Sequence, residues 1–309
     1  MVLTRFARID PVTMETGLFC LRPRGAEKEE AAFLVTHRHG ARRYQYEAPY
    51  ALDHVALRVL LALCALAAMS QQPVSAAPSQ EGFQAGRARL NPEFEACQLI
   101  TGNWTGPLAT LTREAGMTTA GSNLARVRQR LQELAKVRVT VFDADTDNLI
   151  GAAQLISFLS ERDSNRVLIT LGPWLSKSIL PSLKGQYVPI CLETLRQIKD
   201  PAGQILHAVF SSRIRERRTT PVRYGVNAVA AIPYAKGSAA GGATQRKRHA
   251  SVRRAMRALA ASGWRIEPVP ATKEGCYDIL RRPPPALPAA PPNRLAPARR
   301  KSPVRASAV

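Results

Sequence analysis

The chain has 309 residues, 45% of them hydrophobic, and its 44 Lys and Arg against 23 Asp and Glu give a formal net charge of +21. This length favours two domains, and so positive a chain attracts nucleic acid or anionic lipid. Five widely spaced cysteines exclude a disulfide framework and a Cys-x-x-Cys zinc pair, and favour a reducing, cytoplasmic compartment. The sequence contains no P-loop, Gly-x-Gly-x-x-Gly, Gly-x-Ser-x-Gly or His-Glu-x-x-His motif, so an enzyme would have to use a less obvious site. We expect no enzyme, no cofactor and no metal site.

The N-terminal part predicts strands followed by one long helix. Residues 17–50 alternate loosely about His39-Gly40, a turn-type dipeptide between β-prone runs. The apolar run 55–69 is shorter than the ~20 residues that cross a bilayer and contains Arg58, so it predicts a buried helix with Asp53 as its N-cap. Residues 71–105 show no periodicity and predict a long loop.

Residues 107–159 predict two helices followed by a hairpin. A short helix over 107–115 ends at Gly116, and a second begins with Ser122 or Asn123 as its N-cap. One face of this second helix is apolar, through Leu124, Val127, Leu131 and Leu134. A strand over 137–142, the turn "DADTDN" and a returning strand over 151–159 complete a helix-turn-helix with a wing.

The second half repeats this order of elements. We expect helices over 201–217 and 223–232, a long basic helix within "ATQRKRHASVRRAMRALAASGWRIEP", and a hairpin of 264–268 and 276–280 with Lys273 near its tip. A shift of 128 residues places Leu124 on Val252 and Leu131 on Leu259. The sequence therefore predicts an α+β fold of two tandem winged-helix domains, residues 1–180 with an N-terminal β-hairpin and residues 181–282. A disordered Pro/Arg-rich tail, residues 283–309, follows.

The basic helix separates charge from apolar residues. Thr244 is a natural N-cap and Gly263 a stop. Its apolar arc contains Val252, Ala255, Met256 and Leu259, whereas Arg246, Lys247, Arg253, Arg254 and Arg257 lie opposite and Arg248 falls on the apolar side. A solvated face usually mixes signs, and this one carries no acid before Glu267, so DNA contact is favoured over a solvated face.

For the helix over 122–135, DNA contact and a solvated face are about equally favoured. The reason is that Glu133 shares the expected exposed face with Asn123, Arg126, Gln129 and Arg130. Cations on both helices would hold phosphates, and Asn123, Gln129, Gln245 and Arg246 would reach base edges. The candidate DNA-binding residues are Ser122, Asn123, Arg126, Gln129, Arg130, Thr244, Gln245, Arg246, Lys247, Arg248, Arg253, Arg254, Arg257 and Lys273.

From about residue 10 to 283 the chain resembles the replication protein C initiators of IncQ-type plasmids. The segments that carry the resemblance, in order, are "DPVTMETGLFCLRPRG", "APYALDHVALRVLLALCALAA", "GPLATLTREAG", "LARVRQRLQELAKVRVTVF", "RVLITLGPWLSKSIL", "ATQRKRHASVRRAMRALAASGW" and "YDILRRP". The resemblance implies two winged-helix domains that bind double-stranded DNA at directly repeated iterons of an origin and help open it. It also implies a separately encoded helicase and primase as partners; we further allow for a homodimer of the free protein and expect no membrane association.

Three alternatives compete with this interpretation. A rolling-circle nickase is suggested by "THRHG" with Tyr44 and Tyr46, although Arg38 would repel a metal there. "DADTDN" resembles a calcium loop, but Asn148 and Gln154 stand where that loop needs Gly and Glu, which favours a polar turn. A winged-helix transcriptional regulator stays open as an alternative, because the fold does not distinguish replication from repression.

Trp264 is expected to pack under the wing formed by the hairpin of 264–268 and 276–280.

Overall fold

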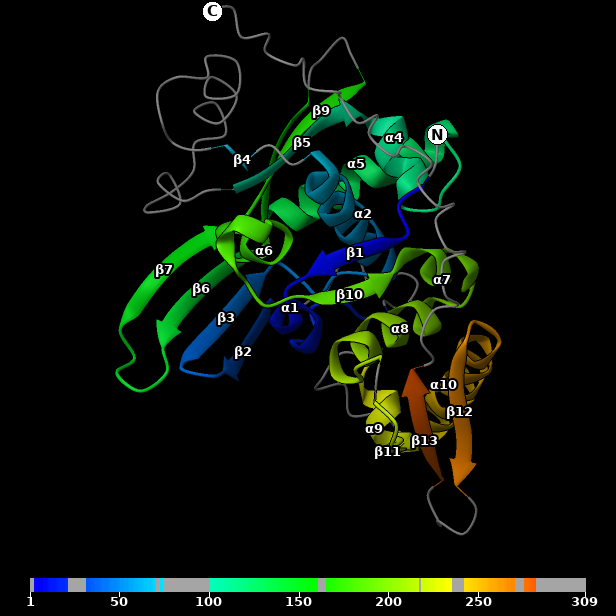
Figure 1. The fold of residues 1–309 in the computed structure, drawn as a ribbon. Coiled ribbons are helices and arrows are strands. Elements are labelled where there is room, and N and C mark those ends of the chain that lie inside the picture. The colour runs from blue at the N-terminus through cyan, green and yellow to red at the C-terminus, as the bar shows by residue number, and fades with distance from the viewer. Residues whose placement is uncertain are drawn as a thin grey trace, which may run out of the picture.

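The computed structural model describes residues 3–21, 32–70, 73–74, 101–160, 165–216, 218–234, 242–269 and 275–281. Two four-stranded antiparallel sheets and one long helix dominate the first part of the chain (Figure 1). One sheet has the order β2-β3-β6-β7, from β2 (Phe33–His39), β3 (Arg42–Ala48), β6 (Arg138–Asp143) and β7 (Leu149–Gln154). The other has the order β4-β5-β9-β8, from β4 (Pro73–Val74), β5 (Thr101–Pro107), β9 (Arg166–Leu171) and β8 (Ile156–Ser160).

Helix α2 (His54–Ser70) forms the centre of the first core. Twelve consecutive or near-consecutive apolar side chains between Val55 and Ala67 are buried, as its apolar sequence predicts. Asp53 caps the helix, since its Oδ1 accepts the backbone N–H groups of Val55 and Ala56 at 3.0 and 2.9 Å. Among the described residues, no helix is long and apolar enough to cross a membrane.

Short elements close the first core around α2. Strand β1 (Phe6–Ile9) pairs with β10 (Val188–Cys191), which lies far away in sequence. The accompanying helices are α1 (Pro11–Glu15), α4 (Leu108–Glu114), α5 (Gly121–Ala135), α6 (Pro173–Ile179), the 3-10 turn η3 (Pro181–Leu183) and α7 (Leu192–Gln197).

A second, smaller core lies beyond α7. Helices α8 (Pro201–Arg213), α9 (Val226–Ala231) and α10 (Gly242–Ala261) pack beside a sheet of order β11-β13-β12. Its strands are β11 (Val222–Gly225), β12 (Trp264–Val269) and β13 (Cys276–Arg281). Leu206, Phe210, Val252, Leu259 and Trp264 are buried together here. The β6–β7 and β12–β13 hairpins project from different ends of the molecule (Figure 1).

The structure corrects several predicted boundaries. Residues 101–105 belong to strand β5 and not to a loop. The strand expected over 151–159 is divided, because β7 ends at Gln154 and β8 enters the other sheet. The helix expected over 223–232 begins as strand β11, where Arg223 pairs with Asp278. Of the loop expected over 71–105, residues 73–74 form β4, and residues 71–72 and 75–100 lie outside the described residues, as do Lys273 and the tail 283–309.

Candidate nucleic-acid interface

The first candidate surface is built on α4, α5 and the β6–β7 hairpin. Val127, Leu131 and Leu134 are fully buried and fix α5 against α2, as the apolar spacing predicts. The helix begins at Gly121, and its N-cap, Ala120, makes no side-chain hydrogen bond. The prediction that Ser122 or Asn123 caps it is therefore wrong, and Asn123 Nδ2 instead donates to the backbone oxygen and hydroxyl of Thr118.

The exposed side of α5 carries fewer charges than the sequence predicts. Ser122, Arg126 and Gln129 are exposed and Asn123 is half-buried. Arg130 is buried, with its Nη2 2.9 Å from Asp53 Oδ2 and its Nη1 on the carboxylate of the buried Glu133. The prediction that Arg130 and Glu133 lie on the exposed face is wrong, because both are buried. The charge of Arg130 is neutralised there by the carboxylates of Asp53 and Glu133. This geometry argues against Arg130 as a phosphate contact.

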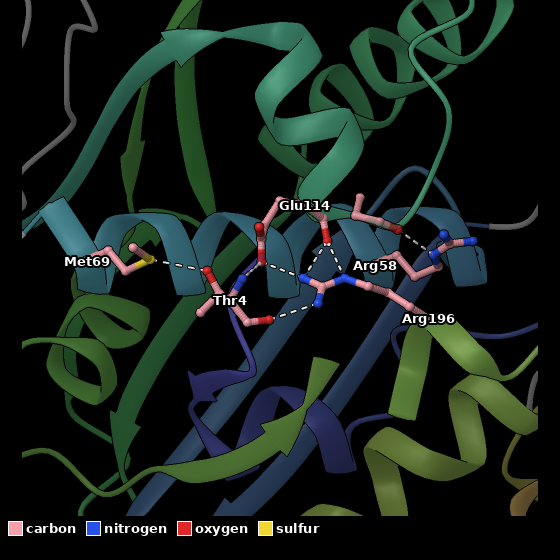
Figure 2. A network of polar contacts seen from close by, with 6 residues as sticks. Thr4, Arg58, Met69, Glu114 and Arg196 are labelled. Carbon is pink, nitrogen blue, oxygen red and sulfur yellow. Dashed lines mark hydrogen bonds and ion pairs between the residues drawn. The ribbon is translucent and has the colours of Figure 1, made fainter. Parts of the chain in front are cut away.

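The turn between α4 and α5 is clamped by two arginines from other elements (Figure 2). Arg196 binds the carboxylate and backbone oxygen of the buried Glu114 and donates to Thr4 O at 2.8 Å. Arg58 of α2 donates to Ala115 O and Gly116 O at 2.7 and 2.6 Å. Cations at these carbonyls satisfy groups that the end of a helix leaves unpaired.

Gly116 is required at this turn. Its φ of +72° favours glycine, and a Cβ there would lie 2.7 Å from Arg196 Cγ and 2.8 Å from Arg58 Nη2. The sequence identifies Gly116 as a helix stop but gives no signal for the partners of Arg58 and Arg196. These contacts hold the start of α5 in a fixed position relative to α2 and α7.

The second candidate surface is built on α10, and its predicted apolar face is confirmed. Val252, Ala255 and Leu259 are fully buried and Met256 nearly so, against α8 and α9. The helix begins at Gly242, so Thr244 lies inside its first turn and the predicted N-cap at Thr244 is wrong. The predicted stop is present, because Gly263 has φ +97° and β12 begins at the next residue.

The outward side of α10 is strongly cationic. Its exposed predicted residues are Thr244, Gln245, Arg246, Lys247, Arg253, Arg254 and Arg257. Arg254 Nε lies 2.7 Å from Oδ2 of Asp200, the residue that caps α8. Arg248 is half-buried, with its guanidinium carbon 4.9 Å from the ring centroid of Tyr234, in line with its predicted position toward the apolar side.

A polar group that the sequence does not reveal stands beside the first turns of α10. Asn227 of α9 places its Oδ1 2.8 Å from His249 Nε2 and 3.5 Å from Gln245 Nε2. Asn227 follows an apolar residue in a short helix, and nothing in that local pattern indicates a pairing with α10. The contact fixes His249 and Gln245 on the exposed side of the helix.

The hairpin of this second part rests on Trp264, as predicted. Trp264 is buried, and its Nε1–H donates to Nδ1 of the buried His207 at 3.0 Å. Because the indole nitrogen only donates, His207 carries its proton on Nε2 and donates it to Cys191 O at 3.0 Å. Burial lowers the pKa of His207 to about 3, so the ring is neutral.

The tip of the β6–β7 hairpin is a polar turn, as expected. Asp143 Oδ1 accepts the backbone N–H groups of Asp145 and Thr146. Asp145 and Asp147 pair with Arg38 and Arg43 of the neighbouring hairpin. These carboxylates neutralise arginines at the hairpin tips and do not converge on one point.

Comparison with known proteins shows the family. The sequence profile described as Replication protein C (RepC) matches residues 3–283. The chain belongs to the RepC family. No curated protein sequence matches the chain significantly.

The fold is similar to that of domains 2 and 3 of RctB. A crystal structure of selenomethionine derivatives of these domains has a TM-score of 0.55 and 11% sequence identity, and covers 88% of this chain and 99% of that one. A second crystal structure, of RctB domains 2–3 over residues 155–483, has a TM-score of 0.44 and 10% identity, and covers 88% and 97%. RepC membership gives the chain a role in DNA replication, and hence an interaction with DNA.

In this RepC chain the tyrosines of the nickase alternative are inaccessible. Tyr46 is fully buried and its hydroxyl lies 3.0 Å from Thr13 Oγ1, and Tyr44 is also buried. Burial raises the pKa of both phenols, which opposes formation of the phenolate nucleophile. The "THRHG" segment is a plain hairpin with Arg38 paired to Asp145.

Proposed function

We propose that this chain is a plasmid replication initiator that binds double-stranded DNA at direct repeats of an origin and assists opening of the adjacent duplex. The observation that carries the proposal is α10, whose apolar residues are buried while Arg246, Lys247, Arg253 and Arg257 face outward without a carboxylate partner in the described part of the chain. A helix anchored on one side and cationic on the other suits a major groove lined by phosphates.

We propose that each half is a winged-helix unit. In the first, α4 and α5 precede the β6–β7 hairpin, and in the second, α9 and α10 precede the β12–β13 hairpin. The short strand β11 pairs with β13, which adds a third strand beside the second hairpin. This order supports α5 and α10 as the recognition helices. Since β10 pairs with β1, we place the change from one unit to the other at α8 rather than at residue 180.

The roles of the exposed residues follow from their chemistry. Arginine and lysine on α10 would hold phosphates on both sides of the groove, and Gln245 and Arg246 near the helix start would reach base edges. On α5, Arg126 would contact phosphate and Gln129 a base edge. We keep Arg130 out of this set, since its charge is engaged with Asp53 and Glu133.

A replicative helicase and a primase are the proposed protein partners, with a homodimer as the form of the free protein. A transcriptional regulator with the same units is the second candidate. Two units in one chain suit a long, repeated site without a partner, which favours the initiator.

The test is a footprinting experiment, which measures how far the chain and two charge-matched variants protect origin repeats from cleavage. Arg246→Ala, Lys247→Ala and Arg253→Ala together should abolish repeat-specific protection while the helix stays folded, because Ala is a strong helix former. The control removes Arg38, Arg43 and Arg223, which are each paired with a carboxylate, and should leave protection intact. Unchanged protection by the α10 variant would contradict the proposal, and repeats protected without any effect on plasmid replication would favour the regulator.

A further inference from the structure

A second cationic surface lies on elements other than α5 and α10. The guanidinium carbon of Arg42 (β3) and Nζ of Lys177 (α6) lie 5.9 and 4.9 Å from the ring centroid of Trp174. The guanidinium carbon of Arg8 (β1) lies 4.7 Å from the ring centroid of Tyr187. We refer to these five residues as the aromatic–cationic surface.

Polar contacts join the two halves of this surface. His39 stands opposite Arg42 in the β2–β3 register, and its Nε2 lies 3.1 Å from Gln186 Oε1. Ser178 of α6 donates its hydroxyl to Gln186 O at 2.8 Å. The residue before Tyr187 is therefore tied both to the hairpin that carries Arg42 and to the helix that carries Lys177.

The cations of the aromatic–cationic surface are not neutralised. Within the described ranges, Arg8, Arg42 and Lys177 form no ion pair with a carboxylate, whereas Arg38 and Arg43 of the same hairpin pair with Asp145 and Asp147. Burial and the charge of Arg42 lower the pKa of Lys177, so the two cations repel one another at close range. An anion bound between them would relieve that repulsion.

Aromatic rings distinguish this surface from the candidate recognition helices. Tyr187 is 47% exposed beside Arg8, while α5 and α10 contain no Phe, Trp or Tyr. Duplex DNA keeps its bases stacked inside and presents phosphates and groove edges, so it needs cations and amides. A single strand presents unstacked bases as well, and proteins that bind it combine cations with exposed rings.

We propose that the aromatic–cationic surface binds single-stranded DNA, with Arg8, Arg42 and Lys177 on the phosphates and a base stacked on Tyr187. The proposal rests in part on the proposed function, since opening an origin exposes single strands. It differs from that function in its ligand and in its residues.

The experiment measures fluorescence anisotropy of the full chain with an oligothymidylate of about 30 nucleotides and with a mixed-sequence duplex of about 30 base pairs. Arg42→Ala with Lys177→Ala should weaken oligothymidylate binding about tenfold or more and leave duplex binding unchanged. The matched control, Arg38→Ala with Arg43→Ala, removes the same charge from the same region and should change neither. Tyr187→Ala should weaken oligothymidylate binding by a factor of about ten, and Tyr187→Phe should restore it, because both rings stack.

The outcomes separate this proposal from the proposed function. A chain that binds the duplex but not oligothymidylate overturns the single-strand surface alone, and a chain that binds neither overturns the proposed function as well. Equal losses in the two double variants would mean that only net charge matters, which also overturns the proposal. Loss of duplex binding in Arg42→Ala with Lys177→Ala would assign the surface to duplex DNA instead. The α10 triple variant should bind the duplex more weakly and keep oligothymidylate binding.

Discussion

Arg126 and Arg130 are one helical turn apart on α5, and their surroundings give them different roles. Arg126 is exposed, and its Nη2 comes no closer than 4.0 Å to Asp53 Oδ2. Arg130 is buried between Asp53 and Glu133, and its Nη2 lies 2.9 Å from Asp53 Oδ2. A buried ion pair that loses one partner leaves an uncompensated charge in the core, which is strongly destabilising. Arg130 thus serves the fold and Arg126 is available for DNA. Helical spacing alone assigns both to one basic face.

His207 makes the stability of the second core depend on pH. The ring has a pKa of ~6.5 in an unfolded chain and of about 3 in the folded protein, because burial lowers it. Between these values the unfolded chain binds a proton that the folded one does not, so stability is full above ~6.5 and falls as the pH drops, by ~1.4 kcal/mol per unit.

We expect His207→Gln to remove this dependence. The wild type should lose ~2 kcal/mol through His207 between pH 7 and pH 5, and the variant, although less stable at pH 7, should not show that loss. Asp10 acts in the opposite direction, because burial raises its pKa to about 6 and the folded state takes up its proton first as the pH falls. Urea unfolding of both proteins at both pH values isolates His207 as the difference, and parallel pH profiles would contradict the assignment.

At the scale of the element, α10 carries its buried apolar residues and its proposed DNA-binding residues on opposite faces. Leu259 is fully buried and Arg257 is exposed two residues earlier. Leu259→Ala should lower the free energy of unfolding by ~2–5 kcal/mol, since it opens a cavity in the second core. Arg257→Ala should change it by less than ~0.5 kcal/mol and weaken duplex binding. Thermal unfolding and a duplex titration of both variants check this, and a large stability loss in Arg257→Ala would place that side chain in the fold.

The elements with clear periodicity are the ones that the sequence predicts well. The apolar faces of α2, α5 and α10, the hairpin about Gly40 and the hairpin on Trp264 are confirmed, because local pattern and tertiary burial agree there. Strand β5 is missed, since its first four residues are all buried and show no alternation. Strand β11 is missed because the pairing of Arg223 with Asp278 lies 55 residues away.

The same limit applies to the candidate site. The exposed cations of α10 follow from helical spacing, but the burial of Arg130 depends on Asp53, a residue on another element. Likewise Asn227, Arg58 and Arg196 act through partners that sequence spacing does not bring together. The sequence therefore does not predict which distant residues the arginine side chains pair with.

For the whole molecule, whose net charge is +21, the number of phosphates contacted sets the expected salt dependence of duplex binding. If both candidate helices hold phosphates, about 6–10 contacts should give log K a slope against log salt of about −5 to −9. The α10 triple variant should have a slope smaller in magnitude by about 2, since Lys247 and Arg253 are its two proposed phosphate contacts and each contributes about one. Titrations at several salt concentrations measure both slopes, and a nearly flat dependence for the wild type would contradict duplex binding.

The pairing of β1 with β10 also has a consequence for folding during synthesis. Ile9 stands opposite Val188, and Arg196 closes the contact to Thr4, so the first residues of the chain find their partners only after nearly two thirds of it has been made. At about 5–20 residues per second, synthesis up to Arg196 takes ~10–40 s. During that time the edge of β1 stands unpaired, and the first core is completed only as the second begins to emerge from the ribosome.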